Sequence, residues 1–280
     1  MVGHGQTPAP AVGVRVPDAE VLRAKDKRPG IAAGRVEEYA VPSRTLGRER
    51  RVFIYTPPGY QPRESGYDLL LAFDGGEYLS LIPLPLILDT LQAAHLTPAF
   101  VAVLVDDSTD GARLADLANH ARFAAFVGDE LLPWVRQRWA VTHDPKHTIL
   151  TGSSAGGLAS AYLALQRPDL FGNVLAQSPA LWRGSEGSSG PPYEWLTGRY
   201  SALPRQDIRF FIDVGSMETQ PTAGGGPVFI DTSRRFRDVL QAKGYTVTYT
   251  EVPDAVHRPE DWRLRLPIGL VKLTEGWIKD

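Results

Sequence analysis

The strongest constraint on the fold is the alternation, from Asp68 onward, of short apolar segments with longer segments that have helical spacing. The segments 69–73 and 101–105 are apolar at every position, which is typical of strands buried on both faces. Strands that alternate with helices are joined by crossover connections, and these produce a mostly parallel sheet with helices on both faces. The pattern therefore predicts an α/β fold.

Eight segments have the length and composition expected of strands. They are 37–41, 51–56, 68–73, 100–105, 147–151, 173–177, 208–214 and 247–252. Helices are predicted at 83–94, 119–139, 158–166, 229–243 and 263–279. The first two strands are separated by a short turn at 43–48, so we expect them to form an antiparallel hairpin.

The segment 148–157 reads Thr-Ile-Leu-Thr-Gly-Ser-Ser-Ala-Gly-Gly and places G-x-S-x-G between the fifth strand and a helix. In this setting the pattern is typical of a nucleophile elbow, a tight turn that exposes one serine hydroxyl. Side chains at Gly152 and Gly156 would collide with the neighbouring strand and helix. Ser154 is therefore the candidate nucleophile, and Ser153 should point away. The alternative is an ordinary glycine- and serine-rich turn.

Eight strands with the elbow after the fifth predict an α/β-hydrolase fold without a separate cap domain, formed by residues 36–280. Residues 1–35 are rich in proline, glycine and charge, and we expect them to form an arm or linker.

A serine nucleophile needs a general base and an acidic residue that orients the base. In this fold the acid and the histidine follow the serine in that order. His257 alone among the six histidines follows the final predicted strand. Glu218 is the preferred acid because it lies in the loop after the seventh strand, whereas Asp213 lies at the end of that strand. Asp254, or a dyad without a strong acid, are the remaining alternatives.

The oxyanion of an acyl-transfer intermediate needs two backbone donors. The elbow predicts the amide of Ala155 as one of them. The second is expected from the loop 73–78, which reads Phe-Asp-Gly-Gly-Glu-Tyr, and Gly76 is the preferred donor. A plain β-turn is the alternative for this loop.

Three aromatic residues follow the sixth predicted strand, beside the expected substrate pocket: Trp182, Tyr193 and Trp195. They are candidates for stacking on an aromatic group of the substrate. Packing in the core or anchoring of a loop is the alternative.

Composition excludes several other kinds of function. The chain has 280 residues, of which 43% are hydrophobic and 22% charged, with a net charge of −2. This charge gives no reason to expect nucleic acid as a partner. The absence of cysteine excludes disulfides and a thiol nucleophile. No membrane span or signal peptide is expected, which predicts a cytoplasmic location. No metal is expected, because Asp144-Pro145 interrupts the pair His143 and His147, and no cofactor is implied.

The segments 46–60, 73–75, 129–134, 152–157 and 171–178 together resemble the catalytic domain of the enterochelin (enterobactin) esterase family. These are serine esterases of the α/β-hydrolase fold that open trilactone catecholate siderophores. The resemblance covers about residues 36–280. It implies Ser154 as the nucleophile, His257 as the base and Glu218 as the acid.

The sequence departs from the family's pattern at several positions. The family's N-terminal β-sandwich domain has no counterpart in the arm. In the segment 114–120, Ala115 and His120 stand where the family carries arginine and asparagine. An alanine cannot make the charge-assisted contacts of an arginine, and His120 becomes a candidate substrate-binding residue. Near the base, Ala255-Val256-His257-Arg258 replaces the family's Gly-Gly-His-Asp.

The sequence therefore predicts a serine carboxylic ester hydrolase that acts on a small-molecule ester through an acyl-enzyme, with siderophore ester hydrolysis as the activity that the resemblance implies. The alternatives are an acyltransferase on the same fold and a non-catalytic protein that binds a siderophore or another ligand. The oligomeric state is left open.

Overall fold

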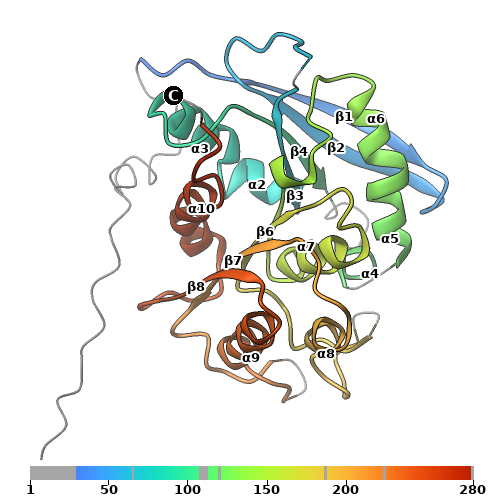
Figure 1. The fold of residues 1–280 in the computed structure, drawn as a ribbon, viewed down its shortest axis with the longest axis vertical. Coiled ribbons are helices and arrows are strands. Elements are labelled where there is room, and N and C mark those ends of the chain that lie inside the picture. Colours follow the sequence, from blue (N-terminus) through green and yellow to red (C-terminus); the bar gives the residue numbers. More distant parts are fainter. Residues whose placement is uncertain are drawn as a thin grey trace, which may run out of the picture.

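A computed structural model describes residues 30–64, 66–106, 113–118, 121–185, 188–222 and 225–278. Across these ranges a single sheet of eight strands has the order β1-β2-β4-β3-β5-β6-β7-β8 (Figure 1). The strands are β1 (Arg35–Ser43), β2 (Arg48–Thr56), β3 (Asp68–Phe73), β4 (Phe100–Asp106), β5 (Thr148–Ser153), β6 (Asn173–Gln177), β7 (Arg209–Gly215) and β8 (Thr246–Val252).

The sheet is antiparallel at one end and parallel elsewhere. Strand β1 pairs antiparallel with β2, and β2 pairs antiparallel with β4. The pairings from β4 through β3 and β5 to β8 are all parallel. The predicted hairpin and the predicted mostly parallel sheet are therefore confirmed.

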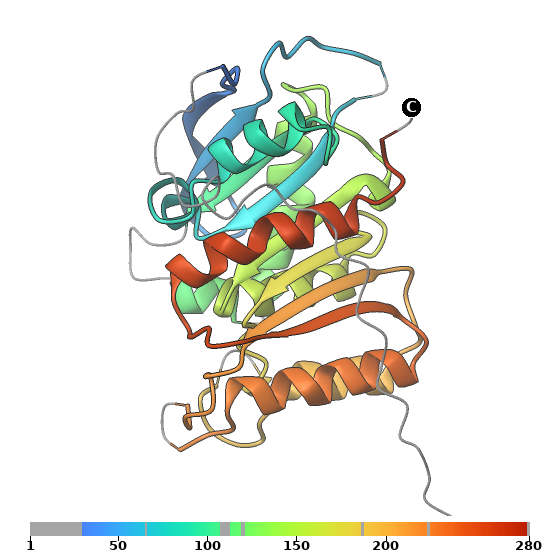
Figure 2. The same ribbon diagram turned by 90° about the vertical axis from the view of Figure 1, so that its left-hand side faces the viewer.

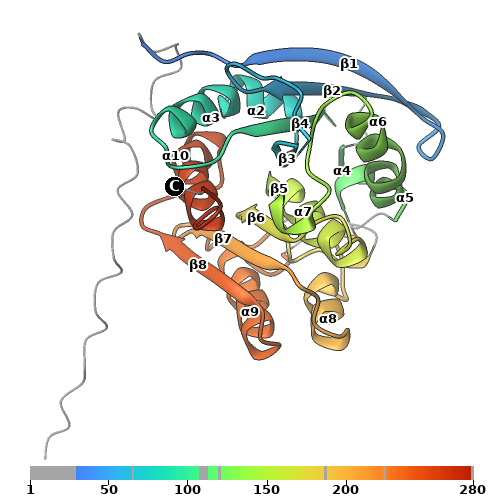
Figure 3. The ribbon, with the colours of Figure 1, turned by 45° about the horizontal axis from the view of Figure 1, so that its top comes forward.

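Helices follow most of the strands. They are α2 (Gly75–Ser80), α3 (Leu84–Ala93), α4 (Arg113–Leu117), α5 (Ala121–Ala125), the π-helical η1 (Phe126–Leu131), α6 (Leu132–Arg136), the 3₁₀ turn η2 (Pro145–His147), α7 (Ala155–Gln166), α8 (Trp195–Ala202), α9 (Phe229–Ala242) and α10 (Pro259–Leu273). Figure 3 shows α2, α3 and α10 on one side of the sheet and α4 to α7 on the other. No helix in the described ranges is long and apolar enough to cross a membrane.

The sheet separates two apolar cores, because successive side chains of a strand point to opposite faces. On β3, Leu69, Leu71 and Phe73 face the core beneath α7. Leu70 and Ala72 face the second core, beneath α3 and α10. Figure 2 shows α3 and α10 lying across that face of the sheet. The uninterrupted apolar run of β3 thus reflects burial on both sides.

Two predicted helices differ from the structure. The helix predicted at 263–279 is α10, which begins at Pro259 and ends at Leu273. The helix predicted at 119–139 is divided. The chain forms α5, then η1, then α6, and residues 119 and 120 lie outside the described ranges. The π-helical stretch η1 spans the turn directly before Pro133. Proline has no N–H for the helical ladder, and its ring would clash with the carbonyl four residues earlier. A widened turn accommodates that clash within a continuous helical segment.

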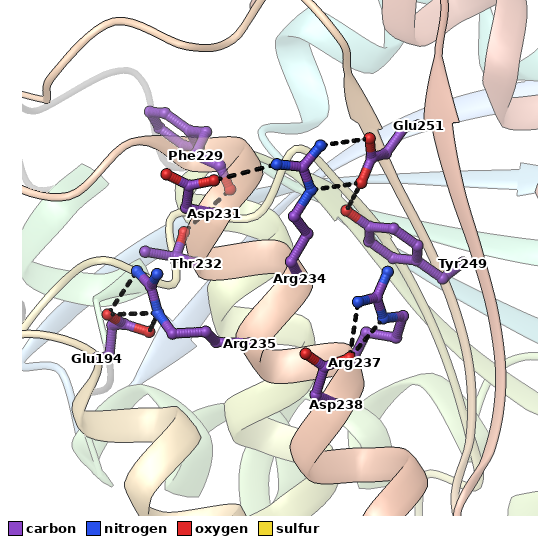
Figure 4. A network of polar contacts seen from close by, with 10 residues as sticks. All are labelled: Glu194, Phe229, Asp231, Thr232, Arg234, Arg235, Arg237, Asp238, Tyr249 and Glu251. Atoms are coloured by element: carbon purple, nitrogen blue, oxygen red, sulfur yellow. Dashed lines mark hydrogen bonds and ion pairs between the residues drawn. The ribbon is translucent and has the colours of Figure 1, made fainter.

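Helix α9 is joined to its neighbours by exposed ion pairs (Figure 4). Arg234 binds Glu251 of β8, with Nε–Oε1 and Nη2–Oε2 distances of 2.8 Å. Arg235 binds Glu194, the residue before α8, at 2.8 Å between Nη2 and Oε1. These contacts link α8, α9 and β8, and the first residue of α9, Phe229, reaches the candidate site.

Candidate active site

Ser154 occupies a strained turn between β5 and α7. Its backbone has φ 53° and ψ −116°, a conformation that is rare for residues with a side chain. The Ser154 N–H donates to Gln177 O at 2.9 Å, and Ser154 O accepts from Ala180 N at 2.8 Å. A Cβ at Gly152 would lie 2.4 Å from the carbonyl carbon of Gly156. The segment therefore has the geometry of an elbow.

His257 and Glu218 are brought together from the loops after β8 and β7. His257 Nδ1 lies 2.7 Å from Glu218 Oε2. An ionised carboxylate only accepts hydrogen bonds, so Nδ1 carries the proton and Nε2 stays available as an acceptor. Burial opposes ionisation of Glu218, but hydrogen bonds from His257 and Ser178 outweigh it and hold the pKa of Glu218 below its usual value.

Asp213, the alternative acid, faces other partners. It is 1% exposed and accepts from Gln177 Nε2 at 3.1 Å. Its Oδ1 lies 3.3 Å from Nη1 of Arg265. Burial raises the pKa of Asp213 to about 6, against the opposing effect of Arg265. Of the two carboxyls, the structure therefore places Glu218 against His257.

The two predicted oxyanion donors differ in their surroundings. Ala155 is the first residue of α7, where backbone N–H groups have no partner within the helix. Gly76 lies in α2 rather than in a plain turn. Its N–H donates to Asp106 Oδ1 over a long 3.3 Å, so this N–H already has an acceptor in the structure. The assignment of Gly76 stays a prediction.

Charged residues that the sequence analysis did not single out lie beside the elbow. Arg113 Nη2 donates to Asp74 Oδ2 at 2.7 Å, and its Nε also contacts Asp74. A Cβ at Gly156 would lie 3.3 Å from Asp74 Oδ2. Glu77 accepts from Ser153 Oγ at 3.4 Å, and burial together with Asp74 raises the pKa of Glu77. The guanidinium of Arg113, two positions before Ala115 in the sequence, is therefore paired with Asp74.

The aromatic candidates take different positions. Trp182 is buried and packs against Phe229 at 6.5 Å between ring centroids. Phe229 in turn lies 4.2 Å from the imidazole of His257. Trp195 instead packs against Tyr162 of α7 at 6.0 Å. Two aromatic rings, those of Phe229 and Trp262, therefore contact the imidazole of His257, and Trp182 packs against the first of them.

No contact with the residues around Ser154 and His257 is described for the other two substrate-binding candidates, Tyr193 and His120. Tyr193 is half-buried, and a Cβ at Gly226 would lie 3.4 Å from its ring. His120 lies outside the described residues. Within the described ranges, no group of three or more His, Asp or Glu side chains is arranged to hold a metal ion.

A family model described as "Putative esterase" matches residues 43–273. The chain belongs to this esterase family. The iron(III) enterobactin esterase of Dickeya dadantii is 33% identical to it, over 80% of this chain and 49% of that protein. The iron(III) enterobactin esterase of Escherichia coli K12 is 27% identical, over 85% of this chain and 57% of that protein.

The structure of ferric enterobactin esterase from Salmonella typhimurium superimposes on this esterase with a TM-score of 0.78. The two are 27% identical over 89% of this chain and 60% of that one. The predicted α/β-hydrolase fold and the predicted family are therefore confirmed. This esterase spans about half the length of the curated relatives it matches.

Several residues that contact the candidate site were not found from the sequence: Arg113, Ser178, Phe229, Trp262 and Arg265. Only two of them occupy positions in the sequence that indicate a site. Ser178 and Phe229 stand near the C-terminal ends of strands or the start of a helix, where sites of parallel sheets form. Nothing in the local sequence shows that Trp262 and Arg265 of α10 reach back to Ser178.

Proposed function

We propose that this member of the esterase family is a serine carboxylic ester hydrolase in which Ser154, His257 and Glu218 form the catalytic triad. The observation that carries the proposal is the 2.7 Å contact between His257 Nδ1 and Glu218 Oε2, in a chain whose Ser154 lies on an elbow. This contact fixes the tautomer that leaves Nε2 of His257 free to take the serine proton.

The proposed reaction has two stages. Ser154 Oγ attacks the ester carbonyl while His257 accepts its proton, and the collapsing intermediate releases an alcohol protonated by His257. Water, activated by the same imidazole, then hydrolyses the acyl-enzyme. The amide of Ala155 is proposed to stabilise the oxyanion in both stages, and a second donor is expected from the segment that contains Gly76.

The proposed substrate class is an ester of a trilactone catecholate siderophore. Three curated relatives carry the name iron(III) enterobactin esterase, which supports this class.

The test is steady-state hydrolysis of p-nitrophenyl acetate and butyrate, beside ferric and iron-free enterobactin. Wild type is compared with Ser154→Ala and with Ser153→Ala, a matched control one residue away. Removing the nucleophile is expected to lower kcat about 10⁶-fold, whereas Ser153→Ala keeps most of the activity.

Turnover of the short esters without cleavage of enterobactin would support the esterase and overturn the siderophore substrate. A wild type that is inert on all four substrates would contradict the proposal and favour a non-catalytic ligand-binding role. Transfer of the acyl group to an added alcohol in preference to water would identify an acyltransferase.

A further inference from the structure

The two carboxylate oxygens of Glu218 have separate partners. Oε2 faces His257 at 2.7 Å. Oε1 accepts from Ser178 Oγ at 2.6 Å and from the N–H of Gly215 at 2.8 Å. The orientation of the carboxylate toward His257 therefore depends on what holds Oε1.

The neighbours of Ser178 determine which hydrogen bond its hydroxyl donates. Trp262 Nε1 donates to Ser178 Oγ at 3.1 Å, and Arg265 Nη2 donates to it at 3.2 Å. A serine hydroxyl has two acceptor lone pairs and one proton. With both lone pairs engaged by N–H donors, the proton points to Glu218.

The position of Ser178 requires burial of its hydroxyl and an unfavourable backbone conformation. Its side chain is fully buried, so bulk water cannot take over its hydrogen bonds. Its backbone has φ 42°, in the left-handed region that residues with a Cβ adopt rarely. The N–H of Ser178 donates to Asp213 O at 2.7 Å, which fixes the strained residue at the end of β6. Strain of this kind is retained where placement matters.

Arg265 adds a buried positive charge behind the hydroxyl. Arg265 is 4% exposed, and its counter-ion is Asp213, whose Oδ1 lies 3.3 Å from Arg265 Nη1. A donor that itself accepts from a cation is a stronger donor, because hydrogen bonds in a chain polarise one another. Asp213 therefore belongs to the same chain of contacts as Glu218: it pairs with Arg265, which donates to Ser178, and Ser178 donates to Glu218.

We infer that Ser178, held by Trp262 and Arg265, is a positioning residue that fixes the Glu218 carboxylate for its hydrogen bond to His257. The inference rests on the proposed function, because it assigns Glu218 to the catalytic triad. Ser178 acts only through Glu218, and it touches neither the substrate nor His257 in this assignment.

The test is a double-mutant cycle between Ser178→Ala and Glu218→Ala, with p-nitrophenyl butyrate as the substrate. Loss of a residue that orients a metal ligand typically costs about 10- to 100-fold in affinity or activity, and we expect a similar cost for a residue that orients a catalytic carboxylate. We expect Ser178→Ala to lower kcat by about that factor with little change in KM. In the Glu218→Ala background the same substitution is expected to change kcat less than about twofold, because coupled residues do not contribute additively.

Two further measurements separate positioning from a purely structural role. Ser178→Gly also removes the hydroxyl but suits the positive φ, so it should fold at least as well as Ser178→Ala and lose the same activity. The proton NMR signal of His257 Nδ1–H, assigned by its loss in His257→Gln, should shift or broaden in both Ser178 variants. Trp262→Phe, which removes one donor and keeps a ring, should cause a smaller loss.

Wild-type kcat and an unchanged Nδ1–H signal in a folded Ser178→Gly variant would overturn the inference. An equal loss of activity in the presence and absence of Glu218 would overturn it too, because Ser178 would then act independently of Glu218. If wild type hydrolyses none of the esters, the proposed function fails, and the NMR comparison still decides whether Ser178 orients Glu218 toward His257.

Discussion

At the scale of single residues, two carboxyl groups five positions apart in the sequence have opposite environments. Glu218 is held by donors that lower its pKa, and Asp213 is buried so fully that its pKa rises to about 6. Sequence position alone left these two residues as competing acids. The difference arises because burial dominates at Asp213, whereas at Glu218 hydrogen bonds from His257 and Ser178 outweigh burial. These neighbours come from other strands and loops, so the difference depends on tertiary structure.

Substituting the two acids separately is expected to give unequal losses of activity. Glu218→Gln should lower kcat by roughly 10⁴, because an amide no longer holds His257 in the required tautomer. Asp213→Asn keeps an acceptor for Arg265 and should cost far less. Steady-state kinetics with p-nitrophenyl butyrate provides the comparison, and a greater loss in Asp213→Asn would make Asp213 the acid instead.

The elbow predicts a stability effect at Gly152. A Cβ there would lie 2.4 Å from the Gly156 carbonyl carbon, and the atoms it meets are backbone rather than the end of a flexible side chain. Gly152→Ala is therefore expected to lower the free energy of unfolding by about 3 kcal/mol or more. Gly198 of α8 is the matched control, since a Cβ there meets nothing within 4 Å and alanine should stabilise the helix by about 0.5–1 kcal/mol. Urea unfolding of both variants measures the difference, and similar values would contradict this account.

At the scale of elements, the central strands β3 and β4 could be predicted because burial on both faces leaves unbroken apolar runs. Helices α2 and α8 were not predicted. Helix α2 begins with Gly75 and Gly76, in a segment predicted to be a loop, and α8 is short and weakly amphipathic. Both helices are held by packing rather than by local propensity, which is why local patterns do not reveal them.

The ion pair that joins α9 to β8 should contribute little to stability. Arg234 and Glu251 have side chains that are 44% and 30% exposed, and water screens such pairs. A double-mutant cycle with Arg234→Ala and Glu251→Ala is expected to give a coupling free energy below about 1 kcal/mol. A coupling of several kcal/mol in thermal or urea unfolding would show that α9 depends on this contact.

At the scale of the whole molecule, the order of the strands brings distant segments to one sheet edge. Ser154, Glu218 and His257 follow β5, β7 and β8, which belong to one run of parallel pairings. The contact between Glu218 and His257 could therefore be predicted from topology alone. The network through Trp262 and Arg265 could not, because it depends on how α10 packs across the sheet. The predicted arm and the predicted cytoplasmic location stay predictions.

The pH dependence of stability should carry the signature of Asp213. The folded chain holds this proton up to about pH 6, whereas the unfolded chain releases it near the ordinary pKa of about 3.9. Between these values the folded state binds more protons, so the contribution of Asp213 to stability grows as pH falls from about 6 to about 4.

Asp213→Asn removes that contribution, so its deficit against wild type should be larger at about pH 4.5 than at about pH 7. Glu218 has the opposite dependence, with stability lost as pH falls through its lowered pKa, but it is present in both proteins and cancels. Urea unfolding at the two pH values tests the difference, and a deficit that is larger at about pH 7 would contradict the raised pKa.

The contact between Trp262 and His257 also gives the molecule an optical property. The indole ring lies edge-on to the imidazole, with 4.9 Å between ring centroids and 87° between planes. A protonated imidazole quenches the emission of an adjacent indole by accepting an electron from its excited state, and a neutral imidazole does so weakly. The fluorescence difference between wild type and Trp262→Phe therefore reports the charge of His257 without any substrate, even in a Ser154→Ala variant that has no turnover.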